Sequence, residues 1–593
     1  MSRVCFGRIS SRYRAVQVPP IRRFCSVITP PYSLRNARCD VTREFRRFAS
    51  SLLRLSEDNV VSSGFSDVEG FEERLIHELV WENLDKWPEK VAMVCAATGR
   101  SYTYSQLRKY SSRLASSFRK LELHPGSTIA LVMPNIPEMV IAIFAASKAG
   151  LCITPLNPAF TALELRSVLE KSNASAVVTS STKFPTVATS IDNMASMKLR
   201  PIVVDDGSTP LSSDCIYFKE LIHGDIEEYM KVDNTPANYE DTAILPFSSG
   251  TTGLPKGVEL SHRNIAANVY QTSHEGVEVG IEATGMFQDV IPLILPIFHI
   301  YGLVECLIKH LRLGAKLILL PQFSPSGFID ILDKHHATLL YLAPPLIQFL
   351  ANTDLVKSNH LETVRHTISG AAPIGRECIE KFRSRANKSM LISQGYGMTE
   401  TSPCITLSNK GNFESVGFVV SNTQLRVVGV EEDNLNRNLG IEEIGEVWVR
   451  GPQIMKGYFQ NPEATANIMD GDWFKTGDLG YYDSQGSVYI KGRLKELIKV
   501  KGLQVAPAEL EELMRGHDKI EDVAVIGVEH KNYGEIPKAF VVLKAGAKVT
   551  EDEIKDYVAQ RVGKYKQLGD VQFTNKIPKS AAGKILRKEL VKL

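Results

Sequence analysis

Short apolar runs alternate with helical stretches from about residue 70 onward. Several of these runs are followed by turn residues and then by a helical period. The runs lie at Thr128–Met133, Ala176–Thr179, Ile202–Asp205, Lys316–Leu320 and Thr338–Leu342. Such alternation is typical of βαβ units, whose strands lie in largely parallel sheets. The sequence therefore predicts an α/β fold with a large N-terminal domain of mixed α/β sheets, which begins with an amphipathic helix at Phe71–Lys86.

The pattern changes after about residue 440, where turns rich in glycine and aspartate separate strands at Gly445–Arg450 and Ser487–Ile490. A compact tail of about 100 residues follows Arg493, and this is a usual size for a domain. Its expected elements are helices at Pro507–Met514 and Glu551–Val562 and strands at Val523–Val528 and Ala539–Leu543. We predict a large N-terminal domain at 49–492 and a small, mobile α+β C-terminal domain at 493–593.

The first 39 residues contain eight arginines, several serines, no lysine and no acidic residue. This composition is typical of an organelle transit peptide, and the segment lacks the apolar core of a secretory signal. Arg46–Ser50 resembles a mitochondrial processing site, so we predict a transit peptide at 1–48 and the mitochondrial matrix as destination. A basic tail without an address is the alternative. Val591–Leu593 resembles a peroxisomal signal, but its valine departs from the usual small residue.

Composition excludes several classes of protein. The 69 basic and 67 acidic residues give a formal net charge of +2, which offers no electrostatic reason for a nucleic-acid partner. The nine cysteines form no CxxC pair, so we expect neither a disulfide framework nor a structural zinc site. The longest apolar stretch, Val290–Val304, is interrupted by prolines and is shorter than the roughly 20 residues of a membrane span. We expect no transmembrane helix, and the oligomeric state stays open.

The segment Ser248–Gly257 has the strongest local signal for chemistry. It follows the apolar run Ala243–Phe247 and contains three glycines, four hydroxyl side chains and Lys256. Glycines let a backbone turn tightly and present N–H groups, and hydroxyls and a lysine add donors and charge, so the segment suits a polyphosphate. It differs from a P-loop because no hydroxyl residue follows the lysine. The alternative, a flexible surface loop, is disfavoured by the order of these residues after a strand.

Three further segments carry weaker signals, each with a surface turn as its alternative. Gln394–Glu400 places an aromatic ring, a hydroxyl and a carboxylate after a predicted strand, where ligands of open α/β folds gather. Near phosphates, such a carboxylate suits Mg²⁺. Asp478, together with Arg493, suits a ribose. Lys584 follows a glycine on a loop of small residues and can approach a substrate closely.

In this order, these segments resemble the adenylate-forming superfamily, which contains acyl-CoA synthetases, firefly-type luciferases and carrier-protein adenylation domains. The resemblance covers about residues 75–593 and looks most like the 4-coumarate–CoA ligase group. It rests also on Leu295–Gly302, Ser369–Pro373 and Gly492–Glu511. The resemblance implies the adenylate-forming enzyme fold and an AMP-forming acid–CoA ligase. In that reaction, a carboxylate attacks the α-phosphate of ATP and releases pyrophosphate, and the thiol of CoA then displaces AMP.

The resemblance also implies roles for individual residues, with Mg²⁺, ATP and CoA as partners. The β- and γ-phosphates would be held by Ser248, Ser249, Gly250, Thr251, Thr252 and Lys256. The nucleotide and its metal would be bound by Gln394, Gly395, Tyr396, Thr399, Glu400 (for Mg²⁺), Asp478 and Arg493. Lys584 would bridge the α-phosphate and the acid, Lys499 and Gln504 would touch the adenylate, Lys501 and Gly502 would line the CoA path, and Lys495 would be the domain hinge.

The acyl pocket is expected to involve His299, Tyr301, Glu305, Ala371, Pro403, Cys404 and Leu407. For His299 we expect a gate or pocket wall and not a general base. Two residues depart from plant 4-coumarate ligases, namely Glu305, where those enzymes carry a small polar residue, and Gln322, where a basic residue meets CoA. A buried carboxylate at 305 would repel or reshape the far end of the acid unless it is paired or protonated. The substrate stays open between an aromatic acid and a medium- or long-chain fatty acid.

Three other functions compete with the ligase. A luciferase-like enzyme would adenylate and then oxidise its substrate, and an adenylation enzyme would transfer the acyl group to an acceptor other than CoA. A non-catalytic binding protein is the third, and it is disfavoured because Lys256, Glu400, Asp478, Arg493 and Lys584 are all present.

Overall fold

The computed structural model describes residues 52–207, 213–223, 238–248, 255–500, 503–531, 533–580 and 583–592, with only the backbone at 503–504. These residues belong to one compact unit that begins at Ala49. The predicted leader, 1–48, lies outside them, and the predicted domain boundary after residue 492 stays a prediction. No helix of the described ranges is long and apolar enough to cross a membrane.

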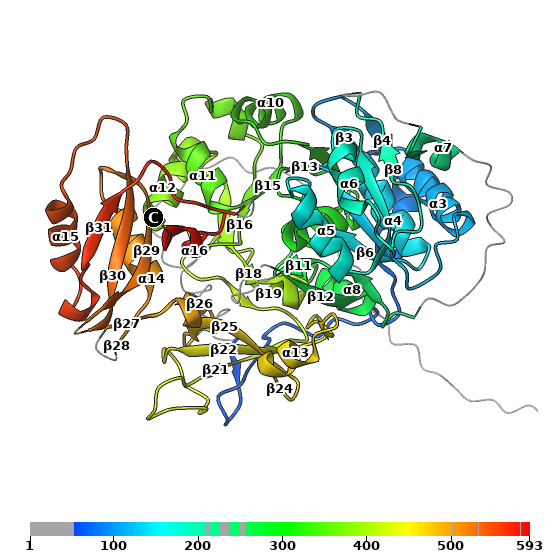
Figure 1. The fold of residues 1–593 in the computed structure, drawn as a ribbon. Helices are drawn as coiled ribbons and strands as arrows, with labels where there is room; N and C mark the ends of the chain where they lie inside the picture. The colour runs from blue at the N-terminus through cyan, green and yellow to red at the C-terminus, as the bar shows by residue number, and fades with distance from the viewer. Residues whose placement is uncertain are drawn as a thin grey trace, which may run out of the picture. The chain divides into compact units, whose positions relative to one another are not determined.

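The largest sheet contains nine described strands in the order β11-β12-β10-β6-β5-β7-β8-β9, with β23 beside β12 (Figure 1). The strands from β10 to β9 along this order are parallel, and β12 runs antiparallel to its neighbours. Their bounds are β5 Thr128–Val132, β6 Cys152–Pro155, β7 Ala174–Ser180, β8 Ile202–Val204, β9 Ile216–Tyr217, β10 Thr242–Ile244, β11 Phe247–Ser248, β12 Lys256–Ser261 and β23 Gly457–Tyr458. The predicted parallel α/β class is confirmed.

Helices cover both faces of this sheet, because its central strands are apolar on both sides. Along β5, Ile129 and Leu131 pack into the core that contains α4, whereas Ala130 and Val132 pack against α5 and α6. This is the alternation of side chains that a strand imposes. The helices of this layer are α3 Tyr104–Lys120, α4 Pro137–Lys148, α5 Ala162–Lys171, α6 Phe184–Ile191, α7 Phe218–His223 and α8 His262–Thr272.

Three smaller sheets complete the α/β part. One has the order β13-β14-β3-β4, the second is the parallel set β15-β16-β17, and the third is β18-β19-β20. Their bounds are β3 Val91–Cys95, β4 Ser101–Thr103, β13 Val290–Leu293, β14 Lys316–Leu319, β15 Leu339–Leu342, β16 His366–Ser369, β17 Leu391–Gln394, β18 Tyr396–Gly397, β19 Cys404–Leu407 and β20 Phe418–Val419. The helices here are α10 Pro325–His335, α11 Pro344–Asn352 and α12 Arg376–Arg385. The candidate segments at 369–373 and 394–400 thus begin at the carboxyl ends of adjacent strands.

An antiparallel sheet of seven described strands has the order β1-β2-β21-β22-β25-β24, with β26 beside β25. The strands are β1 Arg54–Leu55, β2 Val61–Ser62, β21 Gln424–Val428, β22 Gly445–Arg450, β24 Met469–Asp470, β25 Trp473–Tyr482 and β26 Val488–Arg493, with helix α13 Pro462–Ile468 beside them. In the β25–β26 pair, Asp478 lies directly opposite Arg493. The register therefore places two candidate site residues on neighbouring strands.

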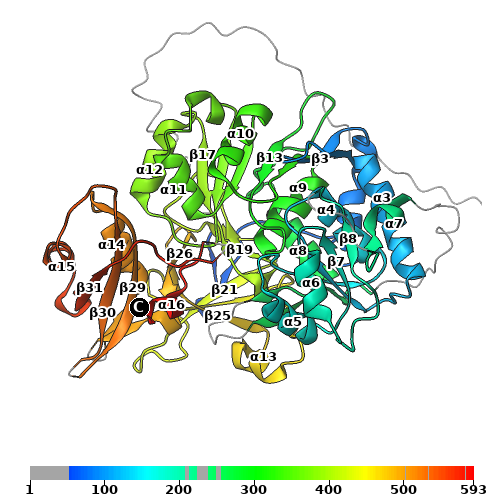
Figure 2. The same ribbon diagram turned by 45° about the horizontal axis from the view of Figure 1, so that its top comes forward.

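The C-terminal part is a sheet of five described strands, in the order β28-β27-β30-β29 with β31 beside β30 (Figures 1 and 2). Alternate residues of β29 face opposite layers, with Val523 and Val525 in the core formed with α14 and α15, and Ala524 and Ile526 in the core that includes Leu590 of α16. The bounds are β27 Ile498–Val500, β28 Leu503–Val505, β29 Ile520–His530, β30 Gly534–Leu543, β31 Asp570–Phe573, α14 Pro507–Arg515, α15 Glu551–Ala559 and α16 Arg587–Leu590.

The single helix predicted at Phe71–Lys86 is wrong. The structure has a short helix α2 at Ile76–Trp81 and a separate 3₁₀ turn at Leu84–Lys86. Leu75 is extended, and its backbone N–H donates to the side chain of Glu78, which fixes the start of α2. Asparagine at 83, just before the 3₁₀ turn, favours turns over helix interiors.

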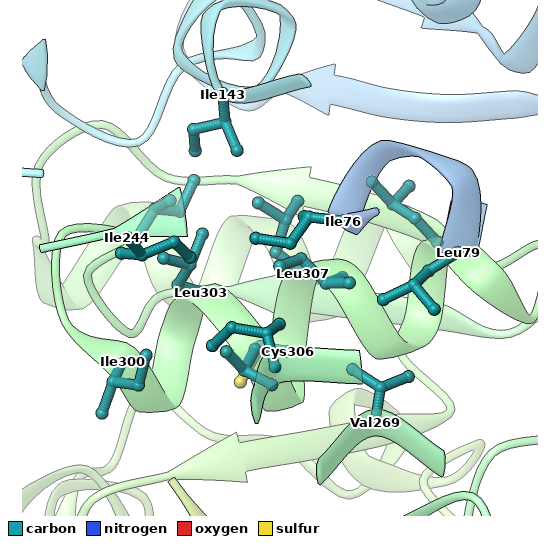
Figure 3. Packing of buried hydrophobic residues seen from close by; sticks show 14 of the residues in the cluster. Ile76, Leu79, Ile143, Ile244, Val269, Ile300, Leu303, Cys306 and Leu307 are labelled. Atoms are coloured by element: carbon teal, nitrogen blue, oxygen red, sulfur yellow. The ribbon is translucent and has the colours of Figure 1, made fainter. Parts of the chain in front are cut away.

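A π-helix, η2, spans Tyr301–Ile308 and continues into α9 at Lys309–Arg312. Figure 3 shows Leu303, Cys306 and Leu307 of this helix among side chains of α2, α4 and α8. Gly302 is needed at its first turn, because a Cβ there would lie 2.3 Å from the carbonyl oxygen of Pro296. π-Helical turns are rare and often occur at functional sites, so η2 directs attention to the residues on it.

Leu303→Ala is expected to lower the free energy of unfolding by about 2–5 kcal/mol, because it leaves a cavity at a fully buried position. Urea unfolding followed by tryptophan fluorescence measures this loss. The matched control is Leu163→Ala on α5, where the side chain is 80% exposed and the change should stay within about 0.5 kcal/mol. Equal effects of the two substitutions would contradict the packing of η2.

Candidate active site

The predicted phosphate-binding segment connects two antiparallel strands. Ser248 ends β11 and pairs with Lys256, which begins β12. Residues 249–254, and with them the predicted contacts of Ser249, Gly250, Thr251 and Thr252, lie outside the described residues. At the two ends that are described, Ser248 donates a hydrogen bond to Glu400, and the ammonium of Lys256 lies 4.8 Å from the ring centre of Tyr458.

Glu400 joins this segment to the second cluster. Its side chain is on the short turn Thr399–Thr401, and only 8% of the residue is exposed. One carboxylate oxygen accepts hydrogen bonds from Ser248 at 3.1 Å and from Tyr458 at 2.9 Å. Glu400 therefore lies beside Ser248, at a described end of the predicted phosphate-binding segment, and its role as a magnesium ligand stays a prediction.

Tyr458 is a site neighbour that the sequence analysis missed. It lies on β23, which pairs with β12, and it contacts both Glu400 and Lys256. The local sequence around Gly457–Tyr458 does not predict these contacts, because they depend on a strand pairing between segments about 200 residues apart. The place of Tyr458 beside the site follows from the pairing of β23 with β12 in the structure.

The arrangement around Glu400 fits a Mg²⁺ ion that is shared with a polyphosphate. Among the described residues, no cluster of three or more His, Cys, Asp or Glu side chains is able to hold a metal by itself. Glu400 offers a nearly buried carboxylate beside the hydroxyl of Ser248 at the mouth of the phosphate loop. Mg²⁺ is commonly bound in this way, by one or two carboxylates together with phosphate oxygens.

Tyr396, Asp478 and Arg493 come together from three strands. The Tyr396 hydroxyl donates to one oxygen of Asp478 at 2.7 Å, and the guanidinium of Arg493 lies 3.3 Å from the other oxygen. Burial raises the pKa of Asp478, and the positive charge of Arg493 opposes that shift. A flat ring, a carboxylate and a forked donor at one place suit the ring and the hydroxyls of a nucleoside.

Lys584 lies near the same groups. Its loop is closed by backbone hydrogen bonds with Ser580, and a Cβ at Gly583, where φ is +80°, would lie 3.1 Å from Pro345 at the start of α11. Burial lowers the pKa of Lys584, the charge of Arg493 lowers it further, and Asp478 and Glu400 oppose this. The C-terminal tail thus brings a cation near the carboxylates of Asp478 and Glu400.

The positive charge of Lys584 also acts on His299. Burial, reinforced by the positive charge of Lys584, lowers the pKa of His299 to about 4. The imidazole is therefore neutral near pH 7 and is a weak proton acceptor. The pocket-wall role expected for His299 stays a prediction.

Of the expected pocket residues, Glu305, Pro403, Cys404 and Leu407 are buried, and Tyr301 lies against the segment that holds Ala371. The ring of Tyr301 lies against Gly370, where a Cβ would be 3.0 Å from a ring carbon, and the next residue, Ala371, has a φ of +75°. A positive φ is uncommon for a residue other than glycine. Cys404 and Leu407 are buried on β19, and Leu407 lies 3.1 Å from the Cβ position of Gly395. Glu305 is buried as well, and it forms an ion pair with Lys309. The buried carboxylate at 305 is therefore paired, which is one of the two conditions under which it would not repel the acid.

Of five further predicted residues, two are described with their side chains and three are not. Lys499, on β27, is exposed and lines a hollow of about 790 Å³ with Leu497, Lys531 and Glu535. Lys495 lies on the turn Leu494–Glu496, whose Glu496 pairs with Arg587. Lys501, Gly502 and the side chain of Gln504 are outside the described residues. The predicted roles of these five positions stay predictions.

The N-terminal and the C-terminal parts of the chain both match models of known protein families. Residues 80–459 match the model of the AMP-binding enzyme family, and residues 509–584 match that of the AMP-binding enzyme C-terminal domain. The chain is 36% identical over 537 residues to 4-coumarate–CoA ligase 1 of Arabidopsis thaliana, covering 87% of this chain and 92% of the relative. It is 37% identical over 545 residues to 4-coumarate–CoA ligase 1 of Petroselinum crispum, covering 90% and 96%.

Solved structures have the same fold. ATP-bound MatB from Rhodopseudomonas palustris superposes with a TM-score of 0.76 at 27% identity, covering 88% of this chain and 99% of that one. A benzoate CoA ligase from Burkholderia xenovorans LB400 superposes with a TM-score of 0.75 at 25% identity, covering 87% and 99%. The predicted large domain with a small α+β C-terminal domain is confirmed as the fold of these proteins.

Proposed function

The chain belongs to the AMP-binding enzyme family and is an ATP-dependent acid–CoA ligase, and on that premise we propose how its residues divide the reaction. The observation that carries the proposal is the convergence of Glu400, Asp478 and Lys584, from segments far apart in the sequence, around one charged site. Binding and charge neutralisation account for the chemistry, since no covalent nucleophile is required to make an acyl-adenylate.

In the first half-reaction, a carboxylate oxygen of the acid forms a bond to the α-phosphorus of ATP, and pyrophosphate leaves. Tyr396, Asp478 and Arg493 hold the nucleoside, and Ser248 and Lys256 hold the departing phosphates. Lys584 lies where one ammonium reaches both reactants and reduces the repulsion between two anions. Glu400 holds Mg²⁺, which when bound neutralises charge on the phosphates.

In the second half-reaction, the sulfur of CoA forms a bond to the acyl carbonyl carbon, and AMP leaves. We propose that the C-terminal domain turns about Lys495 between the two steps, so that the face bearing Lys499 replaces the loop bearing Lys584. Support comes from the places of the two lysines, since Lys584 lies among the nucleotide-binding residues and Lys499 lines a separate hollow. Hinge motions of this kind gate many enzymes.

The substrate is an aromatic acid of the 4-coumarate type or a medium- or long-chain fatty acid. The test is a panel of hydroxycinnamates, benzoates and graded fatty acids with ATP, Mg²⁺ and CoA, in which pyrophosphate and AMP are measured together. We expect one class of acid to give AMP in a CoA-dependent way. Pyrophosphate release without CoA-dependent turnover would contradict CoA as the acceptor, and the exposed Gln322 would be the first position to examine.

The pH dependence of adenylation should report Lys584. The charged ammonium is the form that neutralises phosphate, and burial lowers its pKa, so raising the pH removes the charge earlier than for an ordinary lysine. We expect kcat/KM for the acid to fall on the alkaline side at a pKa below the ordinary lysine value. Thioester formation from supplied acyl-AMP should lack this limb, and an identical limb in both half-reactions would contradict the assignment.

The mitochondrial matrix is the proposed location, on the strength of the arginine-rich and acid-free first 39 residues. Fusion of residues 1–60 to a fluorescent protein should direct it to mitochondria, and the mature chain should begin at Ala49. A diffuse signal with an intact N-terminus would contradict the proposal, and import into peroxisomes that depends on Val591–Leu593 would favour the alternative.

A further inference from the structure

A cluster of three charged side chains lies beside the expected acyl pocket, two of them buried and the third partly buried. Glu305 on η2 is 4% exposed, Lys309 at the start of α9 is fully buried, and Glu278 comes from the segment after α8. Glu305 and Lys309 are one turn apart, so they lie on the same side of the helix. Burial of ionisable groups is costly unless their polar atoms are satisfied.

Their polar atoms are not all satisfied. The Lys309 ammonium lies 3.4 Å from Glu278 and 3.7 Å from Glu305, which exceeds the usual range of about 2.7–3.2 Å for a hydrogen bond. One oxygen of Glu278 accepts the backbone N–H groups of residues 279 and 280. In the part of the chain that the structure describes, Lys309 Nζ, Glu305 Oε1 and Glu278 Oε2 make no hydrogen bond. Buried polar atoms of this kind call for a water or a ligand group.

The charged cluster lies next to pocket residues from two elements. Burial raises the pKa of Tyr301, and the nearby groups Cys306, Glu305 and Cys404 reinforce the shift. Burial and the charge of Glu305 likewise raise the pKa of Cys404. Glu305 and Tyr301 lie four residues apart on η2, so their side chains are on the same side of that helix. The interactions of Glu305 with Tyr301 and Cys404 agree with this placement, and we place both residues in the pocket wall. The group that satisfies the cluster can then be part of the bound acid.

The cluster favours one kind of group. A hydroxyl accepts a hydrogen bond from the ammonium and donates one to a carboxylate, so it satisfies both signs of charge. A carboxylate at the remote end of the acid would be repelled, because the cluster already contains two glutamates and only one lysine. A methyl end would leave all three buried atoms without partners.

We propose that Glu278, Glu305 and Lys309 form the polar end of the acyl pocket and select acids that carry a hydroxyl group at the end remote from the carboxylate. The proposal rests on the acid–CoA ligase function and narrows its substrate. Glu305 and Lys309 thereby become specificity-determining residues, and unbranched fatty acids and dicarboxylates become poor substrates.

The test compares matched acids that differ only at the remote end. The pairs are 4-hydroxycinnamate with cinnamate and 8-hydroxyoctanoate with octanoate, and suberate is the dicarboxylate. The wild-type enzyme should prefer the hydroxyl member of at least one pair by roughly tenfold to hundredfold in kcat/KM, because the analogue strands buried polar atoms. Equal kcat/KM values within both pairs would mean that only water fills the cluster, and would overturn the proposal.

The decisive variant is the double substitution Glu305→Leu and Lys309→Met. It replaces the Glu305–Lys309 pair by apolar side chains, a change that folded proteins often tolerate, and Glu278 keeps its hydrogen bonds from the backbone N–H groups of residues 279 and 280. We expect the hydroxyl preference to disappear while the methyl-ended acid gains. Survival of the preference in the double variant would overturn the proposal. Lys334→Met, on the exposed face of α10, is the matched control and should keep the wild-type ratio.

Two measurements keep the proposal separate from the ligase function and from folding. If the wild-type enzyme makes no CoA thioester from any acid, the ligase function fails. Calorimetric titration of the same acid pairs into the wild-type protein then decides the proposal by their ratio of Kd values. Glu305→Gln keeps the shape of the side chain and should reduce the hydroxyl preference if the double variant does not fold. An unchanged ratio in the glutamine variant would count against the proposal.

Discussion

Lys584→Ala is expected to slow formation of the acyl-adenylate by about 10²–10³-fold, the usual cost of removing one preorganised charge or donor from a reaction centre. Pyrophosphate release with acid, ATP and Mg²⁺, in the absence of CoA, measures this step. The physical reason is the position of the ammonium, which is held by the closed loop at residues 580–584 near Asp478 and Glu400. A water molecule in its place is neutral and would not reduce the repulsion between the carboxylate of the acid and the phosphates of ATP.

The second half-reaction separates a catalytic role from a structural one. Thioester formation from supplied acyl-AMP and CoA should stay within about threefold of wild type, because bond formation at phosphorus is already complete. Lys588→Ala is the matched control, since Lys588 is an exposed lysine four residues further along the same tail. Equal loss in both half-reactions would show that Lys584 supports the fold of the tail and not the first step.

The family resemblance predicts Tyr396, Asp478 and Arg493 as nucleotide-binding residues, and the structure brings their side chains together. Tyr396 follows a strand end, and Asp478 and Arg493 lie on two strands joined by a short turn. Parallel strands bring their carboxyl ends to one edge, and a hairpin brings residues of its two strands face to face. These rules bring Asp478 to Arg493, whereas the contact of Tyr396 with Asp478 joins segments 82 residues apart and depends on the tertiary structure.

Other features depend on contacts that no local pattern contains. Tyr458 reaches Glu400 only through the pairing of β23 with β12. Glu305 is a different case, because its spacing of four residues from Lys309 is visible in the sequence, whereas the approach of Glu278 is a tertiary contact. The helix expected at 71–86 fails for a related reason, since tertiary burial of Phe71 and the hydrogen bond from the Leu75 N–H to the Glu78 side chain outweigh a helical period.

Glu400→Gln is expected to reduce adenylation by about 10²-fold and to raise the Mg²⁺ concentration required for half-maximal rate. The amide keeps the shape of the side chain, and its carbonyl oxygen can still accept the hydrogen bonds from Ser248 and Tyr458. What is lost is the negative charge, which a neutral oxygen does not replace as a ligand for a hard divalent cation. A titration of the pyrophosphate-release rate against Mg²⁺ measures both effects.

The form of that titration distinguishes metal binding from a general loss of the site. If Glu400 holds the metal, high Mg²⁺ should recover part of the rate, and binding of AMP, which lacks the β- and γ-phosphates, should change by less than about threefold. Glu463→Gln on the exposed surface of α13 is the matched control and should follow the wild-type curve. A glutamine variant with an unchanged Mg²⁺ requirement would remove Glu400 from the metal site. The carboxylate would then serve only to hold Tyr458 and Ser248 beside the phosphate loop.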